Sequence, residues 1–124
     1  MDFRDNQAIY LQIATWVYEK ILLKNWPPES RLPSVRELAV ELQVNPNTVM
    51  RTYDYLQQQA VIRNQRGIGF FVETDAIPKI LAYRKEQFLN QELPIFFKDI
   101  FLLNIDIEEI KQKYEDFKKI NEPT

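Results

Sequence analysis

The first pattern in the chain is a helical spacing of apolar side chains near the N-terminus. Between residues 8 and 24 an apolar residue returns every three or four positions, and this period predicts an amphipathic helix with one buried face. A polar segment with two consecutive prolines, Pro27 and Pro28, follows and cannot continue a helix. The helix is therefore expected to end before them. Its buried face is predicted to consist of Tyr10, Ile13, Ala14, Val17, Ile21 and Leu22.

Two short helices joined by a tight turn are predicted next. Ser34 starts a segment with capping-box spacing, in which Ser34 caps the helix and Glu37 reaches back. Residues 43–44 form the turn, Asn45 is a good N-cap, and the third helix covers residues 46–58 with proline at its first position. This arrangement is typical of a helix-turn-helix, which places a helix end in the DNA major groove. The predicted inward positions are Val35, Leu38, Ala39 and Leu42 in one helix and Val49, Tyr53 and Leu56 in the other.

A β-hairpin is predicted after the third helix. Residues 61–63 and 68–73 have strand composition, and residues 64–67 between them have turn composition. The only two glycines of the chain, Gly67 and Gly69, lie in or beside this turn, where glycine permits positive φ and close approach of a partner. A helix-turn-helix followed by a hairpin is a winged helix, so the fold class is mainly α with one small β-hairpin.

The C-terminal segment again shows helical periodicity. Pro94 is expected to kink a first tail helix, Asn104 can end it, and residues 106–109 have the spacing of a second capping box. The final helix is expected to turn Ile107, Ile110, Tyr114 and Phe117 inward. The apolar stripe of the first tail helix consists of Leu89, Leu93, Phe96, Ile100 and Leu103.

This tail is predicted to form a dimer interface. Two helices alone cannot bury two apolar stripes, whereas two copies of the chain can. The alternative is a ligand pocket lined by the tail aromatics, and the dimer interface is the preferred interpretation. The predicted division is a winged-helix domain over residues 1–76 and a helical dimerisation tail over residues 77–124. With the apolar positions of the tail used in this way, no dedicated effector domain remains, and whether a small-molecule effector exists stays open. The tail aromatics are Phe88, Phe96, Phe97, Phe101, Tyr114 and Phe117.

Composition excludes several classes of function. The chain has 124 residues, 45% hydrophobic and 13% aromatic, which suits one domain with an appendage. It has no cysteine and no histidine, so thiol nucleophiles, disulfides, Cys/His zinc sites and a histidine base are excluded. We expect no enzyme, no metal site and no cofactor. The carboxylates Asp106, Glu108 and Glu109 are explained by a favourable helix start rather than by a metal.

Targeting signals are not evident. Residues 1–6 are charged and polar, unlike a secretory signal, and the apolar run of residues 93–103 is interrupted by Lys98 and Asp99 and is too short to span a membrane. We therefore expect a cytoplasmic protein without a membrane partner.

The distribution of charge matters more than its sum. The net charge of −2 argues against nucleic acid when taken alone, because nucleic-acid binders usually carry a basic footprint. Residues 31–72, however, hold five arginines and three carboxylates, a local charge of +2. The basic footprint is thus expected over the winged helix.

Three spaced motifs occur in order along residues 9–72. They are Ile9-Tyr10-x-Gln12-Ile13, Arg31-Leu32-Pro33-Ser34-x-Arg36-Glu37-Leu38-Ala39 and Arg66-Gly67-x-Gly69-x-Phe71-Val72. With these motifs the chain resembles the DNA-binding domain of the GntR family of bacterial transcription regulators. The segment Val44-Asn45-Pro46-Asn47-Thr48-Val49-x-Arg51-x-Tyr53-x-x-Leu56 is similar to the YtrA subfamily. The resemblance implies a short two-helix tail used for dimerisation, and regulators of this kind often sit beside genes for ABC-type transporters.

The chain departs from the family pattern at several positions. The family commonly has glycine where this chain has Asn25, Glu29 and Ala60, which concerns turns more than DNA. Many members carry arginines where this chain has Pro46 and Met50. Since such arginines often read bases, the resemblance implies DNA binding with a different base code.

The candidate DNA contacts follow from this placement. Arg36 suits a phosphate or a guanine, since arginine binds both bidentately, and for Arg51 the two targets are equally plausible. Asn45 is expected to act as a cap, with its backbone available to phosphate. Arg66 and Gly67 suit the minor groove or a phosphate. The predicted DNA-binding residues are Ser34, Arg36, Asn45, Asn47, Thr48, Arg51, Arg66 and Gly67.

Three tyrosines, Tyr10, Tyr53 and Tyr55, are further candidates for stacking on nucleic acid. Tyr53 lies on the inward stripe and is expected in the core, whereas Tyr55 remains open.

The sequence therefore predicts a homodimeric winged-helix transcription regulator, a repressor that binds a palindromic operator in double-stranded DNA. The rival interpretation is a protein-interaction module, because winged helices also serve as adaptors. The exposed arginines Arg36 and Arg66 favour DNA.

Overall fold

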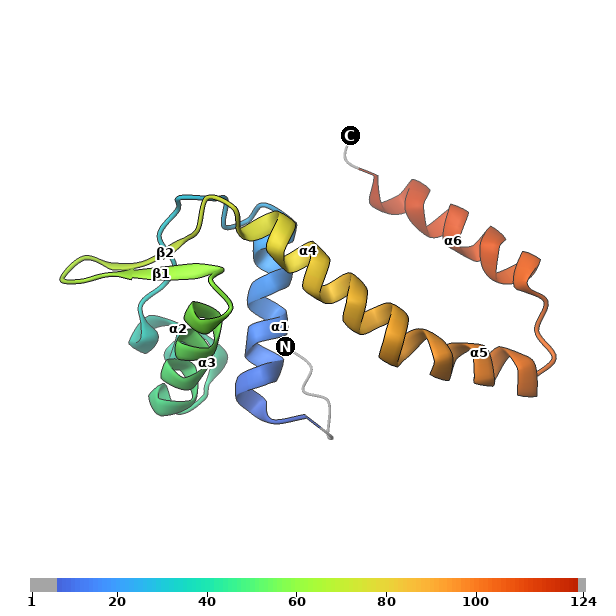
Figure 1. Cartoon of the computed structure of the whole chain (residues 1–124), viewed down its shortest axis with the longest axis horizontal. Helices are drawn as coiled ribbons and strands as arrows, with labels where there is room; N and C mark the ends of the chain where they lie inside the picture. The colour runs from blue at the N-terminus through green and yellow to red at the C-terminus, as the bar shows by residue number, and fades with distance from the viewer. Residues whose placement is uncertain (1–6, 123–124) are drawn as a thin grey trace. The chain divides into compact units, whose positions relative to one another are not determined.

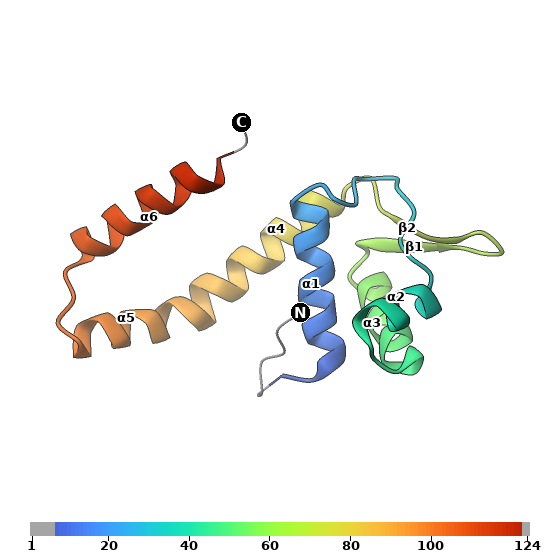
Figure 2. The same ribbon diagram turned by 180° about the vertical axis from the view of Figure 1, so that it is seen from behind.

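The computed structural model describes residues 7–122. Residues 1–6, on which the expectation about a secretory signal rests, and residues 123–124 lie outside the described part. Three helices and a two-stranded antiparallel hairpin form the N-terminal part of the chain, and further helices follow (Figures 1 and 2). The predicted fold class, mainly α with one small hairpin, is thus confirmed. The elements are α1 Ile9–Leu22, α2 Val35–Leu42, α3 Pro46–Gln58, β1 Ile62–Gln65, β2 Gly69–Val72, α4 Ala76–Gln87, the π-helical segment η1 Phe88–Glu92, α5 Leu93–Leu102 and α6 Ile107–Asn121.

The helix-turn-helix forms through local capping, as its sequence predicts. The hydroxyl of Ser34 accepts a hydrogen bond from the Glu37 amide at 3.1 Å, and the Glu37 carboxylate accepts one from the Ser34 amide at 3.0 Å. Gln43 closes α2 in the left-handed region with φ of 56°. Asn45 then caps α3 by accepting a hydrogen bond from the Asn47 amide at 2.8 Å. These caps fix the end of one helix and the start of the next.

The wing has a tighter turn than the sequence predicts. Asn64 pairs with Phe70 and Gln65 pairs with Gly69, so both polar residues belong to β1. The turn consists of residues 66–68 rather than 64–67. The prediction of a turn at Asn64 and Gln65 was wrong because polar residues on an exposed strand have the same composition as a turn.

A third segment pairs with the wing. Arg31 forms an antiparallel bridge with Phe71, and the Leu32 amide donates to the Phe70 carbonyl at 2.8 Å. The Val72 amide donates to the Ser30 carbonyl at 2.9 Å. The segment that leads into α2 therefore anchors the hairpin, and the wing is held to the helix-turn-helix by backbone hydrogen bonds.

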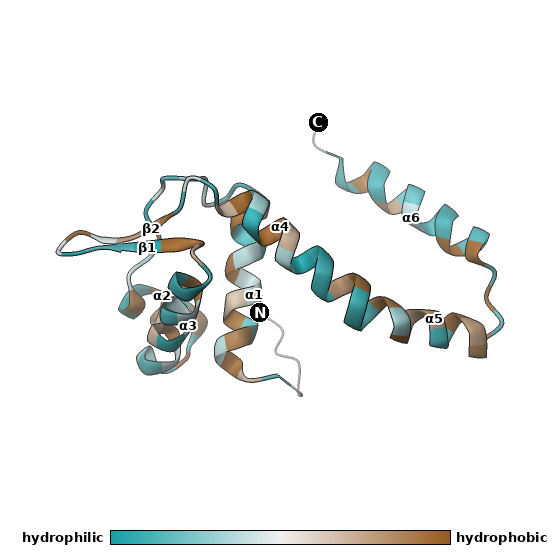
Figure 3. Cartoon of the chain, in the orientation of Figure 1, coloured by the Kyte–Doolittle hydropathy of each residue, from teal (hydrophilic) through white to brown (hydrophobic). Residues whose placement is uncertain are grey.

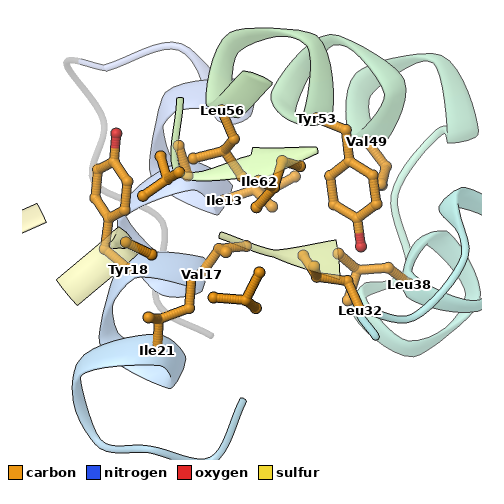
Figure 4. Close-up of a cluster of buried hydrophobic side chains, with 14 of the residues drawn as sticks. Ile13, Val17, Tyr18, Ile21, Leu32, Leu38, Val49, Tyr53, Leu56 and Ile62 are labelled. Carbon is orange, nitrogen blue, oxygen red and sulfur yellow. The ribbon is translucent and has the colours of Figure 1, made fainter. Parts of the chain in front are cut away.

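The core lies between α1, α2, α3 and the base of the wing (Figure 4). Most of the predicted inward side chains of α1 and α3 are buried, and Tyr10 and Leu22 are half-buried. In α1 the structure also buries Gln12 and Tyr18, which the sequence did not place inside. The hydroxyl of Tyr53 donates to the Pro33 carbonyl at 2.7 Å, which satisfies its polar end as burial requires. Thr52, which the sequence did not place inside, is buried and donates to the Tyr10 carbonyl at 2.8 Å.

The chain divides into two compact units between Tyr83 and Arg84. The start of α4 belongs to the first unit, because Ala76 and Ile80 are buried in the winged-helix core. The sequence prediction placed the boundary between Ala76 and Ile77. Where the dimerisation function of the tail begins is a separate question and stays a prediction.

The tail elements are irregular where proline and asparagine occur. The π-helical segment η1 ends at Glu92, and Pro94 is the second residue of the helix α5 that follows. Proline is tolerated in the first turn of a helix because its missing amide hydrogen would have no partner there. Asn104 has a φ of 54° and ends α5, in the left-handed conformation common after a helix C-terminus. Asp106 caps α6 by accepting a hydrogen bond from the Glu108 amide at 3.1 Å. A capping box would have used the amide of Glu109 instead.

Two of the family's glycine positions keep the left-handed conformation without glycine. Glu29 has a φ of 69° and Ala60 a φ of 59°. A residue with a Cβ is strained there by roughly 1–2 kcal/mol. We expect Ala60→Gly to raise the free energy of unfolding by about 0.5–1 kcal/mol, measured by urea denaturation. Ala82→Gly, at an exposed position of the right-handed helix α4, is the matched control and should lower the free energy of unfolding by about 1 kcal/mol. A loss of stability in Ala60→Gly would contradict the strain.

Candidate DNA-binding surface

The start of α3 is exposed and carries the predicted base-reading side chains. Asn47 and Arg51 are exposed and Thr48 is half-buried, and all three lie within the first two turns of α3. Arg36 is the second residue of α2 and is also exposed. The unpaired amides and the positive dipole end of α3 favour a phosphate nearby. The helix-turn-helix therefore presents an arginine from α2 together with polar groups from α3.

Two predicted contact residues are already used as caps. The side-chain oxygens of Ser34 and Asn45 each accept a hydrogen bond from a backbone amide, and the hydroxyl hydrogen of Ser34 and the amide hydrogens of Asn45 can donate to DNA. The hydrogen bond from the Ser34 backbone, followed by that from its side chain, lowers the pKa of Glu37 below the usual range. Glu37 therefore stays ionised and capped in neutral solution. Ser34 and Asn45 can therefore donate to a phosphate while they keep their caps.

Arg51 stacks on an aromatic ring from α1. Its guanidinium carbon lies 4.0 Å from the centroid of the Tyr10 ring. Tyr10 in turn meets Tyr55 edge-on, with 6.1 Å between ring centroids. Tyr55 is half-buried, and its hydroxyl lies 3.2 Å from that of Tyr83. Burial, followed by the hydrogen bond with Tyr83, raises the pKa of Tyr55. Tyr55 is therefore a packing residue rather than an open stacking group for nucleic acid.

The wing tip carries a second set of exposed groups. Arg66 and Gly67 lie in the turn between β1 and β2, and both are exposed. Gly67 has a φ of 81°, a conformation that suits glycine, and a Cβ added there would meet no atom within 4 Å. Ile68 in the same turn is exposed as well. The wing tip can thus approach a DNA groove closely, and it carries one positive charge, that of Arg66.

Arg63 does not belong to the DNA surface, although it contributes to the basic count of the sequence. Its guanidinium forms ion pairs with Glu29 at 2.7 Å and with Glu73 at 2.9 Å. Thr74 donates a further hydrogen bond to Glu29. These contacts raise the pKa of Arg63, with the bond to Glu29 as the largest cause, and lower the pKa of Glu29, chiefly through Thr74. Arg63 therefore ties the wing to the rest of the domain.

Arg31 is a candidate contact that the site prediction missed. It is exposed, it lies on the segment paired with β2, and its guanidinium crosses the face of Gly69. A Cβ at Gly69 would come within 2.8 Å of Arg31 Nε. The sequence signal was available, because Arg31 opens the second family-like motif and Gly69 lies in the third. Only the pairing of the two segments brings them together.

Gly69→Ala is expected to disturb the wing more than Gly67→Ala. Both glycines have positive φ, so both substitutions introduce strain of about 1–3 kcal/mol. Gly69→Ala moves the flexible Arg31 side chain, which costs little, but the φ of 145° at Gly69 lies much further from the left-handed region open to other residues than the 81° of Gly67. Thermal unfolding should therefore show the larger decrease in Tm for Gly69→Ala. Equal decreases would contradict the greater backbone restriction at Gly69.

The predicted dimerisation residues lie on tail helices that bury little. Leu89, Phe96 and Leu103 are exposed, and Leu93 and Ile100 are half-buried. No residue of α5 or α6 is buried. Ile110, expected to face inward in the last helix, is half-buried, while Ile107, Tyr114 and Phe117 are exposed. Figure 3 shows hydrophobic positions over much of α5 and at intervals along α6. The other large apolar side chains exposed in α5 and α6 are Ile95, Phe97, Phe101, Leu102 and Ile120.

The fold and this surface define a winged-helix DNA-binding protein. Residues 9–72 match the family of bacterial regulatory proteins known as the gntR family. The chain belongs to this family: it is a DNA-binding transcription regulator and not an enzyme. Among the described residues, no helix is both long and apolar enough to cross a membrane.

The similarity extends through the tail. The HTH-type regulator YhcF of Bacillus subtilis (strain 168) is 33% identical over 115 residues, 93% of each chain. The HTH-type transcriptional repressor YtrA of the same organism is 30% identical over 112 residues, 90% of this chain and 85% of YtrA. A GntR-family regulator of known structure from Bacteroides thetaiotaomicron is 52% identical, with a TM-score of 0.68 over 90% of this chain and 97% of that one. The predicted resemblance to YtrA-type regulators is thus confirmed.

Proposed function

We propose that this regulator is a homodimeric repressor that binds a palindromic operator. The observation that carries the proposal is the exposed apolar surface of α5 and α6, in a chain whose other unit is a DNA-binding domain sized for one half-site. A second copy can cover that surface, and closed two-fold dimers are the commonest assemblies of soluble proteins. A two-fold dimer requires an operator with matching symmetry, with half-sites about one or more helical turns apart.

The exposed side chains divide into those that contact base edges and those that contact the DNA backbone or minor groove. Arg36, Asn47, Thr48 and Arg51 reach base edges in the major groove, because they extend from the first turns of the two helices of the helix-turn-helix. Ser34 and Asn45 donate to phosphate, because their hydroxyl and amide hydrogens can point to DNA while their oxygens cap the helices. Arg66 and Gly67 follow the backbone or minor groove beside the half-site.

Repression is supported by the similarity to YtrA, a transcriptional repressor that matches most of this chain. A dimer bound over a promoter blocks polymerase without any further domain. We propose transporter genes as targets, in keeping with the resemblance to the YtrA subfamily.

Genome-wide mapping of bound DNA in wild-type and deletion strains, with transcript levels measured in both, tests the function. We expect a small number of sites that share a palindromic consensus and overlap promoters, whose transcripts rise on deletion. Transcripts that fall on deletion would show an activator. Bound sites without internal symmetry would contradict the dimeric reading of DNA.

A further inference from the structure

Tyr10, a residue outside the helix-turn-helix, packs against Arg51, the candidate DNA-contacting arginine of α3. Tyr10 belongs to the first turn of α1, forty-one positions before Arg51 of α3 in sequence, yet the guanidinium lies 4.0 Å from the ring centroid. Figures 1 and 2 show α1 and α3 side by side. The distance is well inside the range of about 6 Å in which a cation over an aromatic face is attracted. The contact thus joins the scaffold of the domain to its DNA surface.

The Tyr10 ring is itself held in place. Its edge contact with Tyr55 fixes it from the α3 side, and Tyr55 is in turn held by Tyr83 of α4. The Tyr10 carbonyl accepts the hydroxyl of buried Thr52, the residue that follows Arg51. The platform under the guanidinium is therefore more rigid than the arginine that rests on it.

No carboxylate competes for this arginine within residues 7–122, where none of the ion pairs involves Arg51. A guanidinium stacked on a ring keeps the N–H groups at its edge available, because the ring occupies only one face of the planar group. The stack therefore restrains the long side chain while leaving its donors open to solvent. A preformed conformation lowers the entropy that binding must remove.

We propose that Tyr10 is a positioning residue that presents Arg51 to a guanine in the operator. The proposal rests on the proposed role of Arg51 in reading bases. A bidentate contact to guanine O6 and N7 needs a fixed plane and direction, whereas a phosphate accepts many approaches. A rigid aromatic platform benefits the first kind of contact far more than the second. Tyr10 thus extends the specificity determinants of the helix-turn-helix to α1.

The test uses the full chain and a duplex selected from random DNA by the wild-type protein. Affinities are measured by fluorescence anisotropy for Tyr10→Leu, Tyr10→Phe, Arg51→Ala and the double variant Tyr10→Leu/Arg51→Ala. We expect Tyr10→Leu to lose about threefold to tenfold in affinity, and Tyr10→Phe, which keeps the ring, to lose less than about twofold. The double variant should bind no more weakly than Arg51→Ala, because Tyr10 acts through that arginine. Losses that multiply in the double variant would overturn the proposal.

A base analogue separates positioning from general folding. The guanine whose replacement affects wild type but not Arg51→Ala is exchanged for 7-deazaguanine, which lacks the N7 acceptor. Wild type and Tyr10→Phe should discriminate between the two duplexes, and Tyr10→Leu should discriminate less. Equal weakening of Tyr10→Leu on both duplexes would assign Tyr10 a structural role or Arg51 a phosphate target, and either overturns the proposal.

The experiment distinguishes a failure of the base-reading role of Arg51 from a failure of the positioning role of Tyr10. If Arg51→Ala binds the selected duplex like wild type, Arg51 is not a reader and the proposal falls with it. If Arg51→Ala loses affinity but Tyr10→Leu does not, only the positioning role is wrong. NMR of the free chain gives an independent readout, because the Tyr10 ring should shift the Arg51 side-chain protons upfield in wild type and Tyr10→Phe but not in Tyr10→Leu. Absence of that shift in wild type would contradict the stack.

Discussion

Leu103→Asp is expected to convert the protein into a monomer and to remove most of its operator affinity. Leu103 directly follows α5 and has 68% of its surface exposed in the single chain, so the charge leaves the monomer fold intact. In the proposed dimer the same carboxylate would be buried without a partner, which is strongly unfavourable. Operator affinity should fall by roughly 10²-fold or more, since the two half-sites would no longer be bound as one linked unit. Sedimentation equilibrium at micromolar concentration and anisotropy titration measure the two effects.

The matched control is Leu23→Asp. Leu23 follows α1 in the winged-helix unit and is 72% exposed, so the chemical change is the same and the exposure is similar. We expect Leu23→Asp to remain dimeric and to bind as wild type does. Phe96→Asp, in the same predicted stripe as Leu103, should behave as Leu103→Asp does. A dimer that survives both tail substitutions would place the interface elsewhere.

Arg36→Ala and Arg51→Ala are expected to lose about 1–3 kcal/mol of specific binding each, the usual value of a bidentate arginine–guanine contact. Both variants should also relax the preference for one base pair in each half-site. The reason is that the guanidinium reads a base edge, whose pattern of acceptors depends on sequence. Binding of each variant to a panel of operators with single base-pair changes measures affinity and preference together.

Arg66→Ala should affect DNA binding in a different way from Arg36→Ala and Arg51→Ala. Because Arg66 is proposed to contact the DNA backbone from the wing tip, its removal should weaken binding to all duplexes alike. The slope of log K against log salt should flatten by about one unit for each phosphate that the protein no longer neutralises. Lys85→Ala removes the same charge from an exposed position of α4 outside the proposed surface and serves as the control. If all three arginine variants bind the operator as wild type does, the DNA surface lies on another face of the domain.

Local signals made the helix-turn-helix predictable. Ser34, Glu37 and Asn45 satisfy helix amides within three residues of themselves, so their roles follow from sequence spacing alone. The inward residues Val49, Tyr53 and Leu56 follow from helical periodicity in the same way. Such features depend on neighbours that the sequence already places next to one another.

Contacts between distant segments could not be predicted. By sequence alone, Arg63 counts as one of the basic residues of the wing. Only the folded chain brings Glu29, 34 positions away, to within 2.7 Å of it. Arg31 meets Gly69 because the segment before α2 pairs with β2, a pairing that no local pattern encodes. Tyr10 was a candidate for stacking on nucleic acid, and its actual partner within the chain is Arg51. Tertiary structure thus decides which residues form the DNA surface, whereas local sequence largely decides the helices and turns that support it.

The number of chains bound to one operator tests the central claim most directly. The wild-type chain is mixed with a selected duplex that carries one binding site, and the mass of the complex is measured by native mass spectrometry or sedimentation. We predict two chains on one duplex, with a two-fold symmetric footprint and no stable complex of one chain at the concentrations that give full occupancy. A full-affinity complex of one chain on a single asymmetric half-site would contradict the account.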